Sequence, residues 1–250
     1  VIPVVVDKVI KNKEAEIKLE EYHKNLEILV TERTKKLQDE IKQRIEAEEK
    51  LNKYLLTWKK LIKDFVFAME KAIEVRDPYT SGHQFRVSEL VRAIAIELGY
   101  DEDRLNGIYF ASLIHDIGKV YIPSEILTKP TKLSTIEYKL IQSHPEIGFE
   151  ILKQIDFPWP LAEIILQHHE RINGSGYPRG LQKNGILNES KIIAVADVVE
   201  AISSHRPYRP ARGIEMALDE IKKNRGVLYD DEIVEICLKI FLQKKFKFSE

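Results

Sequence analysis

Residues 8 to 76 contain no glycine and no proline, and this absence constrains the fold more than any other feature of the 250-residue chain. The stretch therefore lacks helix breakers, and its apolar residues recur at steps of three and four, the spacing of a heptad seam. The seam comprises Leu19, Tyr22, Leu26, Leu29, Leu37, Ile41, Ile45, Leu51, Leu55, Trp58, Ile62, Phe65, Met69 and Ile73. A single helix cannot bury so narrow a stripe, so residues 8–63 are predicted to form a parallel, homodimeric coiled coil. The alternative is a solvated, charged helix that spaces two domains.

The ends of this helix separate two further parts of the chain. Residues 1–7, VIPVVVD, read as a short strand without a partner, and we interpret them as the tail of an upstream sensor domain. From residue 64 the pattern changes to ordinary amphipathic helices with short breaks, and no alternating strand pattern of any length follows. The predicted fold class is therefore all-α, with a helical bundle domain over residues 64–250 preceded by a long coiled-coil signalling helix.

Several capping signals support this division into helices. Thr80 or Ser81 is predicted to cap a helix that runs to Gly99, and Asp101 to cap the next one. Ser134 with a glutamate three residues later has the pattern of a capping box.

Composition excludes several classes of function. The chain has 39 basic and 40 acidic residues and a net charge of −1, whereas a binder of nucleic acid polymers or of membrane surfaces would show a basic excess. No segment has the roughly 18 apolar residues that a membrane span requires. The one cysteine, Cys237, excludes an intrachain disulfide and fits a reducing cytoplasm, and its apolar surroundings predict a core position.

The segment HHERINGSGYP, residues 168–178, joins paired imidazoles to a glycine-rich stretch and directs attention to the histidines. An aspartate within an apolar helix, as in IIAVADVVEA, is costly to ionise without a metal ion or another cation. Five imidazoles and two carboxylates suit iron, manganese or zinc, and the absence of thiolates favours a catalytic over a structural site. The seven candidate ligands are His83, His115, Asp116, His144, His168, His169 and Asp197.

Seven ligands exceed what one ion with room for substrate can use, so we expect two ions with Asp116 bridging them. His83, His115 and Asp197 would complete one site, and the other three histidines would complete the second. Two metal ions about 4 Å apart form a clamp suited to phosphodiester hydrolysis, and they lower the pKa of a shared water.

The motifs also resemble a known family. LIHDIGK is similar to the signature of the HD superfamily of metal-dependent phosphohydrolases. HHERINGSGYPRGL, followed by VADVVEAISSHRPYR, resembles the HD-GYP subfamily of cyclic di-GMP phosphodiesterases. The resemblance covers residues 64 to 245 and places the family's metal ligands on the seven residues named above.

The resemblance assigns further roles. It implies that Asp116 and Lys119 are catalytic, that Lys119 contacts substrate phosphate and that Tyr177 lines the substrate pocket. Arg206 and Arg209 match a basic pair that meets the dinucleotide. Gly174 and Gly176 are expected to let the loop pass close to the substrate. This chain departs from the family pattern at Asn173, Glu200 and Tyr79, where the family has aspartate, aspartate and, in members with a third metal, glutamate.

The implied function is hydrolysis of cyclic di-GMP to linear pGpG, with GMP as a further product, by a two-metal hydroxide mechanism. The metal ions would be iron, with manganese as the alternative, and the domain would be the cytoplasmic output of a signalling protein. Two other functions stay open at this point. One is hydrolysis of a different nucleotide by a related HD enzyme, and the other is a catalytically silent receptor for the dinucleotide.

Overall fold

The computed structural model describes residues 2–76, 82–204 and 213–249. The chain divides into two compact units, Val1–Leu61 and Ile62–Glu250. Among the described residues, no helix combines the length and the hydropathy that crossing a membrane requires.

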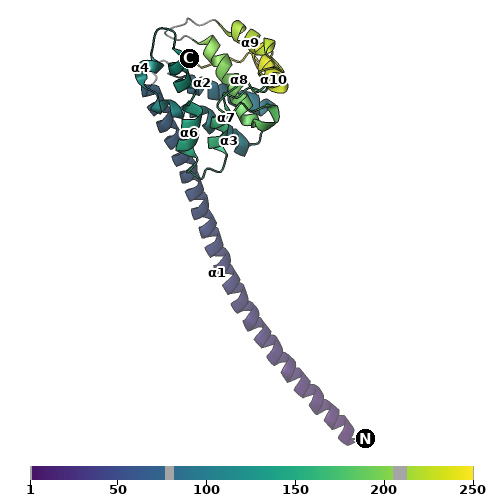
Figure 1. The fold of residues 1–250 in the computed structure, drawn as a ribbon. Coiled ribbons are helices and arrows are strands. Elements are labelled where there is room, and N and C mark those ends of the chain that lie inside the picture. Colours follow the sequence, from purple (N-terminus) through teal and green to yellow (C-terminus); the bar gives the residue numbers. More distant parts are fainter. Residues whose placement is uncertain (1, 77–81, 205–212, 250) are drawn as a thin grey trace. The chain divides into compact units, whose positions relative to one another are not determined.

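Helix α1, Ile2–Arg76, confirms the long helix expected from the sequence (Figure 1). The strand interpretation of residues 1–7 is wrong, because the helix already begins at Ile2. Valine and isoleucine favour strands only where a neighbouring strand supplies hydrogen bonds and packing, and none pairs with this segment. Extending an existing helix by a few residues, in contrast, needs no new nucleus. Pro3 falls in the first turn, where the helix N–H groups lack intrahelical partners anyway.

The second unit is a bundle of short helices, as Figure 1 shows. Its elements are α2 (His83–Glu97), α3 (Glu102–Leu113), η2 (Ile117–Tyr121), α4 (Ser124–Leu127), α5 (Thr135–Ile141), α6 (His144–Leu152), α7 (Leu161–Gln167), η3 (Lys183–Gly185), α8 (Asn188–Ser203), α9 (Ile214–Lys223) and α10 (Asp231–Leu242). Over the described ranges, β-pairing is limited to isolated bridges such as the one between Asn173 and Gln182. The predicted all-α class is confirmed.

The helix starts follow local side-chain chemistry where the sequence signals were strongest. Asp101 accepts a hydrogen bond from the backbone N–H of Arg104, and Ser134 forms a complete capping box with Glu137. Helix α2 starts differently, because its N-cap is Gly82 in the left-handed region at a φ of 68°. The caps predicted at residues 80 and 81 lie outside the described residues.

The core of this unit holds the site-bearing elements in place. Helix α8 is buried over most of its length and packs against α2, α7, α9 and α10, while α6 packs against η2 and α7. Cys237 is fully buried on α10, as predicted, and burial raises the pKa of its thiol to about 12. The packing of α8 against α2 brings residues more than a hundred positions apart into contact.

Candidate metal centre

The seven predicted ligands come from separate elements that converge within the second unit. His83 and His144 are the first residues of α2 and α6, and His168 is the C-cap of α7. His115 and Asp116 lie in the turn between α3 and η2, His169 directly follows His168, and Asp197 lies in the middle of α8. Three groups place their ligand atoms within 4.8 Å of one another: His83, His115 and Asp197; His144, His168 and His169; and His115, Asp116 and His168. The structure therefore brings all seven residues together.

Asp116 lies between the first two of these groups. Its Oδ2 is 3.4 Å from His115 Nε2, and its Oδ1 is 3.3 Å from His144 Nε2. One carboxylate oxygen thus faces each group, which is the arrangement that a bridging ligand requires. Lys119 Nζ donates to Asp116 Oδ2 at 2.7 Å and neutralises part of the charge.

Backbone carbonyls fix the orientation of three imidazoles. In His115, His144 and His168 the Nδ1 atom lies 2.6–2.7 Å from the carbonyl oxygen three residues earlier. A carbonyl can only accept, so Nδ1 carries the hydrogen, and Nε2 is the ring nitrogen that can bind a metal ion. Each ring therefore directs a metal-binding nitrogen into the cluster.

The distance between two imidazole nitrogens indicates whether a metal ion fits the cluster. His144 Nε2 and His168 Nε2 lie 3.2 Å apart. Burial lowers the pKa of His144 to about 4 and holds the pKa of His168 well below its usual range, so a proton between the rings is disfavoured. Two lone pairs at this separation repel unless a cation lies near both. The donor set fits a divalent cation better than it fits protons.

The carboxylates are ionised despite their burial. Burial acts to raise the pKa of Asp116, but the charges of Lys119 and His115 hold it well below its usual range. Burial likewise acts to raise the pKa of Asp197, but its hydrogen bond with His83 and the surrounding histidines together hold this pKa well below its usual range. Anionic oxygens are therefore present at neutral pH, and they could balance the charge of a metal ion held here.

Two of the candidate ligands are less buried than the others. His169 and Asp197 are only partly buried, one in each metal group, whereas the other ligands are buried. The Tyr177 ring stacks on His169 with ring centroids 4.7 Å apart and an interplanar angle of 31°. Burial raises the pKa of the Tyr177 phenol, which therefore stays protonated and can donate a hydrogen bond. Arg206 and Arg209 lie outside the described residues.

The glycines of the GYP segment have roles within the loop itself. A Cβ atom on Gly176 would lie 2.5 Å from both Glu170 Cα and the carbonyl oxygen of His169. Gly174 has a φ of 83°, in the region that favours glycine. Both glycines are thus explained by the path of the backbone, and their predicted proximity to substrate stays a prediction. Asn173 Oδ1 accepts from the N–H and the hydroxyl of Ser175, as an aspartate could, so this departure preserves the turn.

Two positioning residues were missed by the sequence reasoning. Glu170 is buried, and its two carboxylate oxygens accept from the N–H groups of Arg179 and Leu181, at 2.7 and 2.9 Å. It thereby ties the returning end of the GYP loop to the pair of histidines. Gly118 packs so closely on α6 that a Cβ atom would collide with the carbonyl oxygen of His144. The HHE and HDIG motifs contain both residues, but spacing alone does not reveal these contacts.

Comparison with known proteins identifies the family. The HD domain family matches residues 68–233. The chain belongs to the HD domain family. Metal dependence is characteristic of HD phosphohydrolases, and the converging histidines and aspartates of this HD domain agree with it.

Individual relatives give a finer comparison. The chain is 43% identical over 183 residues to the cyclic di-GMP phosphodiesterase of Thermotoga maritima, over 71% of this chain and 50% of that protein. It is 39% identical over 160 residues to the 3′3′-cGAMP-specific phosphodiesterase 1 of Vibrio cholerae, over 64% of this chain and 36% of that protein. The chain thus spans half or less of the length of these relatives. The fold matches the crystal structure of cyclic GMP-AMP specific phosphodiesterases in Vibrio cholerae with a TM-score of 0.56 and 19% identity, covering 72% of this chain and 49% of that one.

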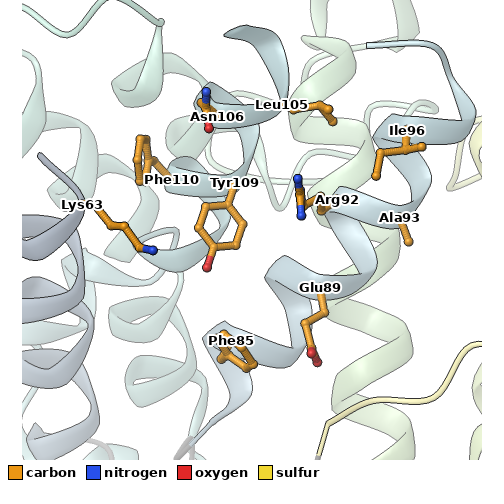
Figure 2. Close-up of a pocket in the computed structure, with 10 residues that line it drawn as sticks. All are labelled: Lys63, Phe85, Glu89, Arg92, Ala93, Ile96, Leu105, Asn106, Tyr109 and Phe110. Atoms are coloured by element: carbon orange, nitrogen blue, oxygen red, sulfur yellow. The ribbon is translucent and has the colours of Figure 1, made fainter. Parts of the chain in front are cut away.

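A separate pocket of about 530 Å³ lies on the HD domain away from the ligand cluster. Figure 2 shows its lining, in which Lys63 of α1 faces side chains of α2 and α3, including Phe85 and Tyr109. None of the seven candidate ligands lines it.

Proposed function

We propose that this HD domain is a metal-dependent phosphodiesterase that hydrolyses cyclic di-GMP to linear pGpG, with GMP as a further product. The observation that carries the proposal is Asp116, which directs one oxygen toward each of two groups of ligands. The relative from Thermotoga maritima, which is a cyclic di-GMP phosphodiesterase, supports the choice of substrate.

Two divalent metal ions would be held by these groups. His83, His115 and Asp197 would hold one, His144, His168 and His169 would hold the other, and Asp116 would contribute to both. The imidazole-rich set favours iron, with manganese as the alternative. When bound, the two ions would polarise the scissile phosphodiester and lower the pKa of water, so that hydrolysis proceeds at neutral pH.

The remaining residues would position the substrate. Lys119 Nζ lies beside Asp116, where its charge can attract a phosphate oxygen and offset negative charge that develops during hydrolysis. Tyr177, beside the partly exposed His169, would offer an aromatic face and a protonated phenol to the dinucleotide. Arg206 and Arg209 are proposed to bind phosphate or the guanine edge, since guanidinium groups form two parallel hydrogen bonds with either.

A different cyclic dinucleotide is the second candidate substrate, because the Vibrio cholerae relative is 3′3′-cGAMP-specific. A catalytically silent receptor is a weaker candidate, because all seven expected ligands are present and converge. Loss of one or more ligands would be expected in a silent domain.

The long helix is proposed to pair with a second copy and to link the HD domain to an upstream sensor. In the single chain the seam residues Leu26, Leu37 and Ile41 are each more than half exposed. Pairing two such helices would bury the stripe that neither can bury alone. A reducing cytoplasm as the location stays a prediction based on the single cysteine.

The test is anaerobic turnover of cyclic di-GMP, 3′3′-cGAMP and a nucleoside monophosphate, with chromatography of the products. We expect the first to be cleaved fastest, and Asp116→Asn to abolish turnover and to lower the metal content. Asp156→Asn, an exposed site on the same domain, is the control and should behave like wild type. Full turnover by Asp116→Asn would refute the proposal. Faster cleavage of 3′3′-cGAMP than of cyclic di-GMP would make 3′3′-cGAMP the preferred substrate. Tight binding of a dinucleotide without product would favour the receptor.

A further inference from the structure

His83 is held differently from the other ligands. In His115, His144 and His168 the Nδ1 atom is hydrogen bonded to a backbone carbonyl three residues earlier. His83 Nδ1 is instead hydrogen bonded to a carboxylate oxygen, Oε2 of Glu200, and its Nε2 lies 3.2 Å from Asp197 Oδ1. One imidazole of the centre is therefore oriented by an anion and not by a peptide group.

Glu200 is itself fixed from two helices. Its side chain is buried, and Oε1 accepts from Arg86 through Nε at 2.8 Å and through a terminal nitrogen at 2.6 Å. The hydroxyl of Ser204 donates to the same oxygen at 2.7 Å. Arg86 lies three residues after His83 on α2, and Glu200 three residues after Asp197 on α8, so the pair joins the two ligand-bearing turns.

The two carboxylate oxygens of Glu200 have different partners. Oε1 is paired with the guanidinium of Arg86, while Oε2 is hydrogen bonded to His83 Nδ1. An ionised carboxylate on Nδ1 makes Nε2 a stronger metal ligand than a carbonyl does, and such partners typically change metal affinity by 10–100-fold.

The two ligand groups therefore differ in charge. The group with His83 contains the carboxylate Asp197 and is supported by Glu200. The group of His144, His168 and His169 consists of imidazoles, and two of them are oriented by carbonyls. Asp116 directs one oxygen toward each group at a similar distance, and the oxygen that faces His115 also accepts from Lys119. The guanidinium of Arg86 offsets part of the Glu200 charge while fixing its direction.

We infer that Glu200 and Arg86 form a positioning pair that makes the group of His83, His115 and Asp197 the tighter of the two metal positions. The inference rests on the metal centre of the proposed function and adds an order of affinity to it. Neither residue touches the substrate in this account, because both act through His83.

The experiment is titration of the metal-free chain with Mn²⁺, with bound metal measured by equilibrium dialysis and elemental analysis. Wild type should show two classes of site. Glu200→Gln should weaken the tighter class by about 10–100-fold and leave the weaker class within about threefold. Glu200→Asp, which keeps the charge on a shorter side chain, should restore part of the loss. Arg86→Gln should also weaken the tighter class selectively.

The matched control is Glu189→Gln, which removes a carboxylate on the same helix that is paired with Arg104. It should leave both classes unchanged. Circular dichroism separates loss of the fold from loss of a site, and the weaker class serves as an internal control for folding. Unchanged affinities in folded Glu200→Gln, or equal weakening of both classes, would overturn the inference while leaving the phosphodiesterase proposal intact. A wild-type chain that binds no Mn²⁺ and no iron would overturn the metal centre itself.

Discussion

Replacing Glu170 with glutamine is expected to lower the free energy of unfolding of the HD domain by about 1.5–3 kcal/mol. The Glu170 carboxylate is buried, and each oxygen accepts one backbone N–H, from Arg179 at 2.7 Å and from Leu181 at 2.9 Å. Glutamine keeps the shape but has one acceptor oxygen, so its NH₂ group must face one of the two N–H donors. One charge-assisted hydrogen bond is lost, and one buried donor stays unpaired.

This decrease in the free energy of unfolding corresponds to one lost hydrogen bond, because the glutamine oxygen can still accept from the other backbone N–H. A loss of this size in a domain of this length corresponds to a decrease in melting temperature of about 3–12 °C. Local opening of the GYP loop would require less free energy than global unfolding. It would appear as faster hydrogen exchange at the amides of Arg179 and Leu181. The free energy of global unfolding would then decrease by less than the full amount.

Urea denaturation and amide hydrogen exchange together measure both responses. The control is Glu150→Gln, which removes an exposed carboxylate of α6 and should change the stability by less than about 0.5 kcal/mol. If Glu170→Gln has wild-type stability and the amides of Arg179 and Leu181 exchange at wild-type rates, the loop is not held by this carboxylate.

Three further predictions concern other parts of the molecule. Gly118→Ala should reduce metal content and destabilise the domain by about 1–3 kcal/mol, because its Cβ would collide with the carbonyl oxygen of His144. Gly185→Ala, whose Cβ would make only ordinary contacts with Leu181 at 3.7 Å, is the control. The metal-free chain should lose stability as the pH falls from 6.5 toward 4, by about 1.4 kcal/mol per pH unit for His144, since the unfolded chain binds a proton there that the folded chain does not. Leu37→Glu should convert the proposed dimer to a monomer in analytical ultracentrifugation, whereas Lys36→Glu on the same turn should leave it dimeric. A monomeric wild-type protein would refute the proposed pairing of two α1 helices.

The sequence predicted the helices with strong local signals and failed where tertiary contacts decide. The long helix, the caps at Asp101 and Ser134 and the convergence of the seven ligands follow from residue type, spacing and resemblance. Residues 1–7 have β-branched side chains and were assigned to a strand, but a strand needs a partner that local sequence cannot supply. Helix α9 was not anticipated, because Gly213 precedes it and offers no side-chain cap.

The site shows the same division between local and tertiary information. The candidate ligands were predictable because an aspartate within an apolar helix is costly to ionise without a cationic partner, and because the family resemblance places ligands on the same seven residues. The contacts of Glu200 with His83 and of Glu170 with the GYP loop depend on how distant segments pack together. Residue spacing in a single sequence does not reveal that packing. The sequence marks Glu200 only as a departure from the family pattern, and the structure connects it to His83 and Arg86 of α2.

Two metal ions are proposed to lie on either side of Asp116. A crystal structure of the manganese-loaded protein, with anomalous scattering measured for that metal, tests it directly. We expect two anomalous peaks about 4 Å apart, one within each group of three ligands, with one Asp116 oxygen directed at each peak. A single peak, or peaks that do not lie beside Asp116, would contradict the two-metal account.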